Sequence, residues 1–107
     1  MIEISTTLIT YNRLDYTKQT IETYLKNTRV SHELIVVDNG SSEETVSYLK
    51  ELYRGKHIQH LNLNKENLYP GAACNQGWEA SSPSRFLHRS DNDLVYKEGW
   101  DDMALRA

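Results

Sequence analysis

The chain has 107 residues, 15 acidic and 12 basic side chains, and a formal net charge of −3. This length predicts one domain, and the lack of a basic block argues against nucleic-acid binding, which needs clustered Lys and Arg. One cysteine, Cys74, excludes an internal disulfide and a cysteine metal cluster. The sequence shows neither a secretory leader nor an apolar run near the ~20 residues of a transmembrane helix. We therefore expect a cytoplasmic protein, with the inner face of a membrane as an alternative location.

The first 27 residues predict a strand followed by a helix. Residues 2–10 are rich in β-branched side chains and alternate with period two, which is typical of a strand. Asn12 is suited to cap a helix. Apolar positions then recur at spacings of three and four as far as Asn27, where we expect that helix to end.

The next stretch predicts a second strand and helix. Residues 33–37, Glu-Leu-Ile-Val-Val, form a short run that is continuously apolar after Glu33, which suits a strand buried on both faces. Ser41 with Glu44 is interpreted as a capping box for the following helix. Gly55 is expected to end that helix.

The sequence after Gly55 predicts two further strands, and a helix follows each of them. We expect strands over residues 57–64 and 85–89, a small-residue helix over 72–81 that lies close to the sheet, and a helix over 97–106. Trp78 and Trp100 are expected to be packing anchors, and His88 a packed histidine.

Alternating strands and helices predict an α/β fold, with an open, mainly parallel sheet, helices on both faces and right-handed crossovers. Three expected strands end in polar stretches, at residues 10–13, 38–42 and 90–93. In a parallel sheet these ends share one edge, which is where open α/β sheets bind ligands.

Asp91 and Asp93 are candidate metal ligands, because they follow the last expected strand two residues apart. Mg²⁺ is held by one or two carboxylates plus substrate phosphates, so the pair indicates a metal-bound phosphate substrate. A solvated turn is the alternative interpretation of these two residues taken alone.

The phosphate is not expected in a glycine-rich cradle, because the sequence has neither G-x-G-x-x-G after the first strand nor a Walker A lysine loop. Asp38 stands at the end of the second expected strand. Its carboxylate either accepts an N–H of a pyrimidine base or makes an Asx turn with its neighbours, and the local sequence leaves both open.

Four motifs, in this order and spacing, resemble glycosyltransferase family 2, whose members are inverting GT-A enzymes that use nucleotide sugars. They are Thr10-Tyr11-Asn12-Arg13, Val36-Val37-Asp38-Asn39-Gly40-Ser41-Ser42, Asn67-x-x-x-Gly71-Ala72-Ala73-x-Asn75-x-Gly77, and Asp91-Asn92-Asp93. The resemblance runs from about Thr6 to about Met103, nearly the whole chain.

The resemblance implies a donor half-domain over residues 1–107 that binds a nucleotide sugar, with UDP or dTDP favoured, and Mn²⁺ or Mg²⁺. It assigns the metal to Asp91 and Asp93, and pairing with the base to Asp38. The nucleotide-binding positions it implies are Thr10, Tyr11, Asn12, Arg13, Asp38, Asn39, Gly71, Asn75, Asp91 and Asn92.

Two residues depart from the family pattern. Asn39 replaces a frequent second aspartate, which leaves the base open, and Cys74 takes a position often held by arginine.

The general base and the acceptor cleft of the family follow the D-x-D, so the fold is expected to be truncated after that motif, without the acceptor half. Asp101 and Asp102 are interpreted as the solvated start of a helix, and the catalytic residue stays unassigned. The chain alone is expected to bind nucleotide weakly and to turn over little, with a saccharide or lipid acceptor unidentified.

One alternative is a non-catalytic binding or assembly module that forms a homo-oligomer or docks on a partner through apolar surface left bare. A nucleotidyltransferase is disfavoured, because Asn12-Arg13 provide no glycine-rich basic loop.

Overall fold

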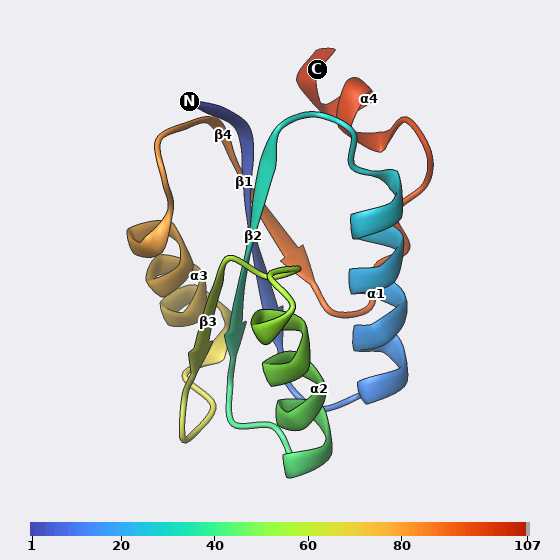
Figure 1. The fold of residues 1–107 in the computed structure, drawn as a ribbon. Coiled ribbons are helices and arrows are strands. Elements are labelled where there is room, and N and C mark those ends of the chain that lie inside the picture. The colour runs from blue at the N-terminus through green and yellow to red at the C-terminus, as the bar shows by residue number, and fades with distance from the viewer. Residues whose placement is uncertain (107) are drawn as a thin grey trace.

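The computed structural model describes residues 1–106, which form one open parallel sheet (Figure 1). The strands lie in the order β3-β2-β1-β4, and all neighbours are parallel. The elements are β1 (Ile2–Thr10), α1 (Leu14–Asn27), β2 (His32–Asp38), α2 (Glu43–Arg54), β3 (His60–Leu63), α3 (Tyr69–Ala80), β4 (Ser84–Asp91) and α4 (Trp100–Arg106). This architecture confirms the α/β fold class predicted from the sequence.

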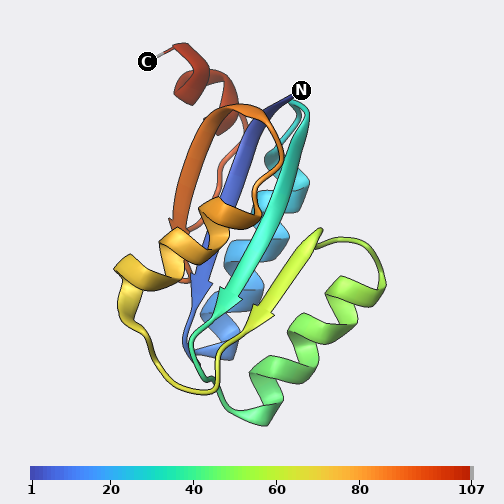
Figure 2. The same cartoon turned by 90° about the vertical axis from the view of Figure 1, so that its left-hand side faces the viewer.

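Two apolar cores lie on opposite faces of the sheet, because successive residues of a strand point to opposite sides. Figures 1 and 2 show α1 and α2 on one face and α3 on the other. The larger core includes Leu8, Ile21, Tyr24, Leu34, Val36, Leu49 and Ile58. The smaller core contains Ile9, Ile35, Val37, Ala73 and Cys74. The run at residues 33–37 is therefore buried on both faces, as predicted.

The order in which strands are added to the sheet reverses after β3. Strands β1, β2 and β3 are added in one direction, and α3 then crosses the other face to place β4 on the far side of β1 (Figure 2). The order therefore reverses between β1 and β4. Ligands of open α/β sheets bind at such a switch point, outside the carboxyl ends of the strands.

Helix α3 approaches the sheet most closely where Gly77 faces Thr7 of β1. A Cβ added at Gly77 would lie 2.2 Å from Thr7 Cγ2 and 2.3 Å from Thr7 Oγ1, which leaves room for glycine alone. Ala73 is fully buried on the same helix, so the predicted close approach of a small-residue helix is confirmed. Trp78 is 41% exposed, because it points roughly 100° around the helix from Gly77. Its predicted role as a packing anchor is wrong.

Two predicted helix caps are wrong, because both side chains bond across the edge of the sheet instead. Asn12 has a φ of 52°, and its Oδ1 accepts the backbone N–H of Ser42 at 2.7 Å. The N-cap position of α1 is Arg13, with a φ of 54°. Ser41 Oγ donates to Asp38 Oδ1 at 2.5 Å and accepts the backbone N–H of Asn12 at 2.7 Å, and the N-cap position of α2 is Ser42. These bonds tie the ends of β1 and β2 together.

Several predicted boundaries shift in the structure. Strand β3 covers His60–Leu63 rather than residues 57–64, and α3 begins three residues early, at Tyr69. Helix α4 begins at Trp100 instead of residue 97. Within residues 1–106, each helix is too short or too polar to cross a membrane.

The segment after β4 runs back along α1. Thr20 Oγ1 donates to the carbonyl of Leu94 at 2.7 Å and accepts the N–H of the same residue at 3.0 Å. The N–H of Tyr96 donates to Thr23 Oγ1 at 2.9 Å. Threonine side chains of α1 therefore replace the strand partners that this extended segment lacks.

Asp101 is 2% exposed, so the prediction that it is solvated is wrong. Its Oδ2 accepts the backbone N–H of Arg29 at 2.8 Å and that of Val30 at 3.0 Å. Burial raises the pKa of this carboxyl, but the N–H donors of Val30, Arg29 and Asp102 outweigh burial and hold the pKa below its ordinary value. Asp102 is exposed, as predicted.

Replacing Asp101 by asparagine is expected to lower the free energy of unfolding at pH 7 by about 1–3 kcal/mol, because an amide satisfies the buried N–H groups less well. The folded pKa is depressed, so this contribution is present above the ordinary carboxyl pKa and is lost as pH falls through the folded value. The gap between wild type and variant should therefore shrink in acid. Urea unfolding at pH 7 and below pH 4 measures it, with the exposed Asp102→Asn as control. An equal gap at both pH values would contradict the assignment.

Candidate functional site

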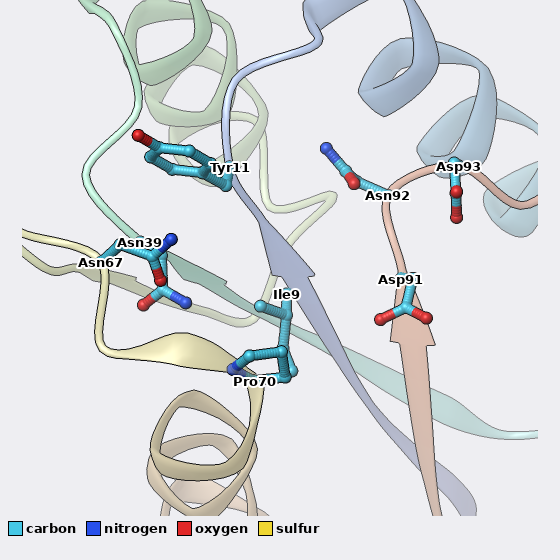
Figure 3. Close-up of a pocket in the computed structure, with 8 residues that line it drawn as sticks. All are labelled: Ile9, Tyr11, Asn39, Asn67, Pro70, Asp91, Asn92 and Asp93. Carbon is cyan, nitrogen blue, oxygen red and sulfur yellow. The ribbon is translucent and has the colours of Figure 1, made fainter.

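A pocket of about 240 Å³ lies at the switch point, beyond the carboxyl ends of β1, β2 and β4. It is lined by Ile9, Tyr11, Asn39, Asn67, Pro70, Asp91, Asn92 and Asp93. Figure 3 shows Tyr11, Asn39 and Asn67 on one side and the turn of Asp91 to Asp93 on the other. The three polar strand ends therefore meet at one edge, as the sequence predicts.

The turn at Asp91 to Asp93 presents two exposed carboxylates to this pocket. Strand β4 ends at Asp91, and Asn92 fixes the turn against the start of α1. Asn92 Nδ2 donates to the carbonyl of Asn12 at 3.2 Å and to Thr17 Oγ1 at 3.1 Å. Because the amide uses its donors in this way, its Oδ1 stays available as an acceptor.

The donor set of this turn fits a hard divalent cation that a phosphate ligand completes. Carboxylate and amide oxygens suit Mg²⁺ and Mn²⁺. In the part of the chain that the structure describes, three or more His, Cys, Asp or Glu side chains nowhere gather to hold a metal. Asp91 and Asp93 therefore suit a metal shared with substrate, rather than a site made of protein ligands alone.

The four residues predicted at the end of β1 divide between pocket and scaffold. Tyr11 lines the pocket and is half-exposed. Thr10 is fully buried, and its Oγ1 donates to Asp38 at 2.7 Å. Asn12 joins the strand ends, as described above. The guanidinium of Arg13 lies 4.4 Å from the centre of the Tyr16 ring, in a neighbouring hollow.

Asp38 and Asn39 are adjacent and buried but have different surroundings. Asp38 accepts hydrogen bonds from Thr10 Oγ1, from the N–H of Ser41 at 2.9 Å and from Ser41 Oγ. These include the contacts of an Asx turn, the second interpretation considered for this residue. A carboxylate has about four acceptor positions, so one stays unused, but Asp38 is fully buried and lies outside the set of residues that lines the pocket. Asn39, by contrast, lines the pocket.

A network of amides fixes the orientation of Asn39. Its Oδ1 accepts Asn64 Nδ2 at 3.1 Å and the N–H of Leu68 at 3.4 Å. Asn64 and Gln76 exchange two further amide bonds, at 2.8 and 3.2 Å. With Oδ1 engaged by the loop, Nδ2 of Asn39 is the group left to donate to a ligand.

The sequence did not predict several residues on the Asn39 side of the pocket. Asn67 belongs to one of the four motifs but has no predicted role there. It lines the pocket, and its Oδ1 accepts the N–H of Tyr69 at 2.7 Å. Pro70 also lines the pocket, and Asn64 and Gln76 support Asn39 from behind. The amides at positions 62, 64 and 67 were the available signal.

Gly71 and Asn75, both predicted to bind nucleotide, are exposed on α3 and lie outside the set that lines the pocket. A Cβ added at Gly71 would meet nothing within 4 Å, so packing does not require glycine there.

His88 belongs to the packing on the α1 face, as predicted. Its Nε2 lies 2.8 Å from the hydroxyl of Tyr96, and its ring centre lies 5.1 Å from that of Trp100. Burial lowers the pKa of His88, which favours the neutral ring at neutral pH.

Comparison with known proteins gives several matches along nearly the whole chain. The profile of Glycosyl transferase family 2 matches residues 5–107. An uncharacterized glycosyltransferase of Rickettsia bellii is 32% identical over 94 residues, which cover 88% of this chain and 13% of that protein. One of Haemophilus influenzae is 30% identical over 98 residues, which cover 91% of this chain and 30% of that protein. The chain thus spans less than a third of either relative.

Solved structures share the fold. S. aureus TarS 1-349 in complex with UDP-GlcNAc matches with a TM-score of 0.80 at 21% identity, covering 97% of this chain and 30% of that one. Mannosyltransferase PcManGT from Pyrobaculum calidifontis, in complex with GDP-Man and Mn²⁺, matches with a TM-score of 0.72 at 18% identity, covering 88% and 28%. These structures show the shared fold, and the family profile over residues 5–107 shows that this chain belongs to glycosyltransferase family 2.

Proposed function

We propose that this chain binds a nucleoside diphosphate sugar with Mn²⁺ or Mg²⁺, for inverting transfer of the sugar to an acceptor hydroxyl. The carrying observation is the pocket at the switch point, with two carboxylates on one wall and amide groups on the other. Asp91 and Asp93 would hold the cation. A bound cation would neutralise charge that develops on the departing diphosphate.

The opposite wall suits a pyrimidine nucleoside. The half-exposed ring of Tyr11 offers an aromatic surface to a base. The free donor of Asn39 can meet a base carbonyl, which uracil and thymine both carry, so UDP and dTDP are favoured. Asp38 holds the strand ends through Thr10 and Ser41. Because it is fully buried, its unused acceptor position would meet a base N–H only if ligand binding opened this edge of the sheet. The UDP and UDP-GlcNAc complexes of TarS support the choice of UDP as first ligand.

Nucleotide binding is the activity to test before transfer, because the carboxylates that follow Asp93 are engaged elsewhere. Asp101 accepts backbone N–H groups of Arg29 and Val30. Glu98 pairs with Arg29 at 2.8 Å, and Asp102 pairs with Arg106 at 3.2 Å. A general base must reach the acceptor hydroxyl within hydrogen-bond distance, and none of these three carboxylates lines the pocket.

The first test is calorimetric titration of UDP into the chain with Mn²⁺ and again with EDTA. We expect heat of binding with the metal and a large loss of affinity with EDTA, since the diphosphate would then meet Asp91 and Asp93 without a bridging cation. GDP serves as the control nucleotide, with the same diphosphate and a different base. Equal binding of UDP in both conditions, or none in either from a folded sample, would contradict the proposal.

The second candidate function is an assembly module, and the exposed edge of the sheet favours it. Phe86 and Leu87 of β4 are about half-exposed on this edge, and exposed apolar surface tends to associate. Sedimentation of the chain with and without UDP separates the candidates. A stable homodimer that gives no heat with UDP would favour assembly, whereas a monomer that binds UDP would favour the donor site.

A further inference from the structure

The pocket lacks a positive charge of its own. Of the residues that the structure describes, the eight that line the pocket include Asp91 and Asp93 but neither lysine nor arginine. One divalent cation cancels the charges of these two carboxylates. The charge of a bound diphosphate would then stay uncompensated in a pocket partly shielded from water, where charges interact more strongly than in bulk solvent.

Arg89 lies directly below this pocket on β4. It is paired with Thr7 of β1, and Asp91 is paired with Ile9, so Arg89 and Asp91 point to the same face of the sheet. The two Cα atoms are separated by two residues of strand, roughly 7 Å. The Arg89 guanidinium nevertheless reaches up the strand, and its NH2 lies 3.9 Å from Asp91 Oδ1.

The contact between Arg89 and Asp91 leaves the guanidinium available. Their side chains are 44% and 61% exposed, and a long ion pair between exposed groups contributes little to stability. Arginine has five N–H donors in a planar fork that matches phosphate as well as carboxylate. A cation on Asp91 would remove the attraction of this carboxylate for Arg89 and free the fork for another anion.

Other arginines near this sheet are engaged away from the pocket. Arg13 lies over the Tyr16 ring in the neighbouring hollow. Arg85 pairs with Glu3 at 3.2 Å, near the opposite end of β4. Arg89 lies on the face of the sheet that α3 covers, because it is paired with Thr7, which faces Gly77 of α3. Its charge therefore partly offsets the rise that burial causes in the pKa of the Cys74 thiol. The first turn of α3 carries Pro70 of the pocket wall.

We propose that Arg89 is a diphosphate-binding residue, whose guanidinium leaves Asp91 and donates to phosphate oxygens when a metal-bound nucleotide enters the pocket. The proposal rests on the proposed function, since it assumes a nucleoside diphosphate at the Asp91–Asp93 turn. Arg89 supplies the charge that Asp91, Asp93 and one divalent cation lack together. Charge-assisted and often bidentate arginine–phosphate bonds are among the stronger polar contacts.

Arg89→Gln tests the proposal, with Arg85→Gln as matched control. Both variants remove one exposed positive charge from the same strand and the same face, and circular dichroism checks that each is folded. With Mn²⁺ present, Arg89→Gln is expected to weaken UDP binding by at least about tenfold, while binding of uridine, which has no phosphate, stays unchanged in NMR titration. Arg85→Gln should bind UDP as wild type does, and Arg89→Lys should retain part of the affinity.

Three results would overturn the assignment. Wild-type affinity of Arg89→Gln for UDP, together with tighter binding of Mn²⁺ alone, would show that Arg89 only neutralises Asp91. An equal loss in Arg89→Gln and Arg85→Gln would show a general effect of charge. Failure of wild type itself to bind UDP with Mn²⁺ would overturn the proposed function, and the assignment of Arg89 with it.

Discussion

Replacing Gly77 by alanine is expected to destabilise the domain by about 1–3 kcal/mol, the usual cost of overpacking a close-packed core. The new Cβ would lie 2.2, 2.3 and 2.8 Å from Cγ2, Oγ1 and Cβ of Thr7. Thr7 is fully buried and β-branched, so it cannot turn away. Helix α3 would have to move off the sheet, which loosens Ala73 and Cys74 in the smaller core. Equilibrium unfolding in urea measures the effect.

Gly71→Ala is the matched control on the same helix. Nothing lies within 4 Å of the added Cβ there, so the higher helix propensity of alanine should stabilise the chain by up to about 1 kcal/mol. Thr7→Ala in the Gly77→Ala background should restore part of the loss, because it removes the two shortest contacts and leaves the one to Cβ. Wild-type stability of Gly77→Ala would show that the contact with Thr7 does not determine how α3 packs.

Replacing Asp91 and Asp93 together by asparagine is expected to weaken Mn²⁺-dependent binding of UDP on the order of 100-fold, because ligand charge sets the affinity of oxygen sites for divalent cations. Asparagine keeps the size and the oxygen of each side chain and removes only the charge. Both aspartates are exposed, and Asn92 anchors the turn independently. The thermal unfolding midpoint should therefore change little. Calorimetric titration with UDP and Mn²⁺ measures the loss.

Asp15→Asn controls for the loss of negative charge near this edge. Asp15 lies in the first turn of α1 and lines the hollow next to the pocket. Its replacement should cost some helix stability, because a negative charge near a helix N-terminus is favourable, and should leave UDP binding unchanged. Retention of metal-dependent binding by the double variant would place the cation elsewhere and would refute the role of the turn.

The fold could be predicted from the sequence because its signals are local. The run from Leu34 to Val37 is apolar without interruption, and only a strand covered on both faces buries all of it. Gly77, among alanines, predicts a helix pressed against a sheet, and the contact with Thr7 confirms it. Apolar positions three and four residues apart located α1 and its end at Asn27 in the same way.

The errors concern polar side chains whose partners are distant in sequence. Asn12 and Ser41 both have good capping propensity, but each bonds to the neighbouring strand end, which only the register of β1 and β2 brings within reach. Asp101 is charged and lies in a first helical turn, so it was expected in solvent. Its N–H donors come from Arg29 and Val30, about seventy residues earlier.

The sequence predicted that the site lies at the carboxyl ends of the strands, but not every side chain that lines it. Order and spacing identified Tyr11, Asn39 and the turn of Asp91 to Asp93, all of which line the pocket. The sequence left open whether Asp38 faces a ligand or a turn, and the structure shows its bonds to Thr10 and Ser41. Asn39 is oriented by hydrogen bonds from Asn64 and Leu68, which lie in the loop after β3. The sequence of that loop has neither helical nor strand periodicity, so it does not predict these contacts.

The most direct test of the proposed donor site is an NMR titration of the ¹⁵N-labelled chain with UDP, first with Mg²⁺ and then with traces of Mn²⁺. We predict shifts of the backbone amides of Tyr11, Asn39 and Asn67 on addition of UDP and Mg²⁺. Broadening by paramagnetic Mn²⁺ should centre on Asp91 and Asp93. Unchanged spectra, or shifts and broadening confined to the β4 edge around Phe86 and Leu87, would contradict a nucleotide-sugar site at the carboxyl ends of these strands.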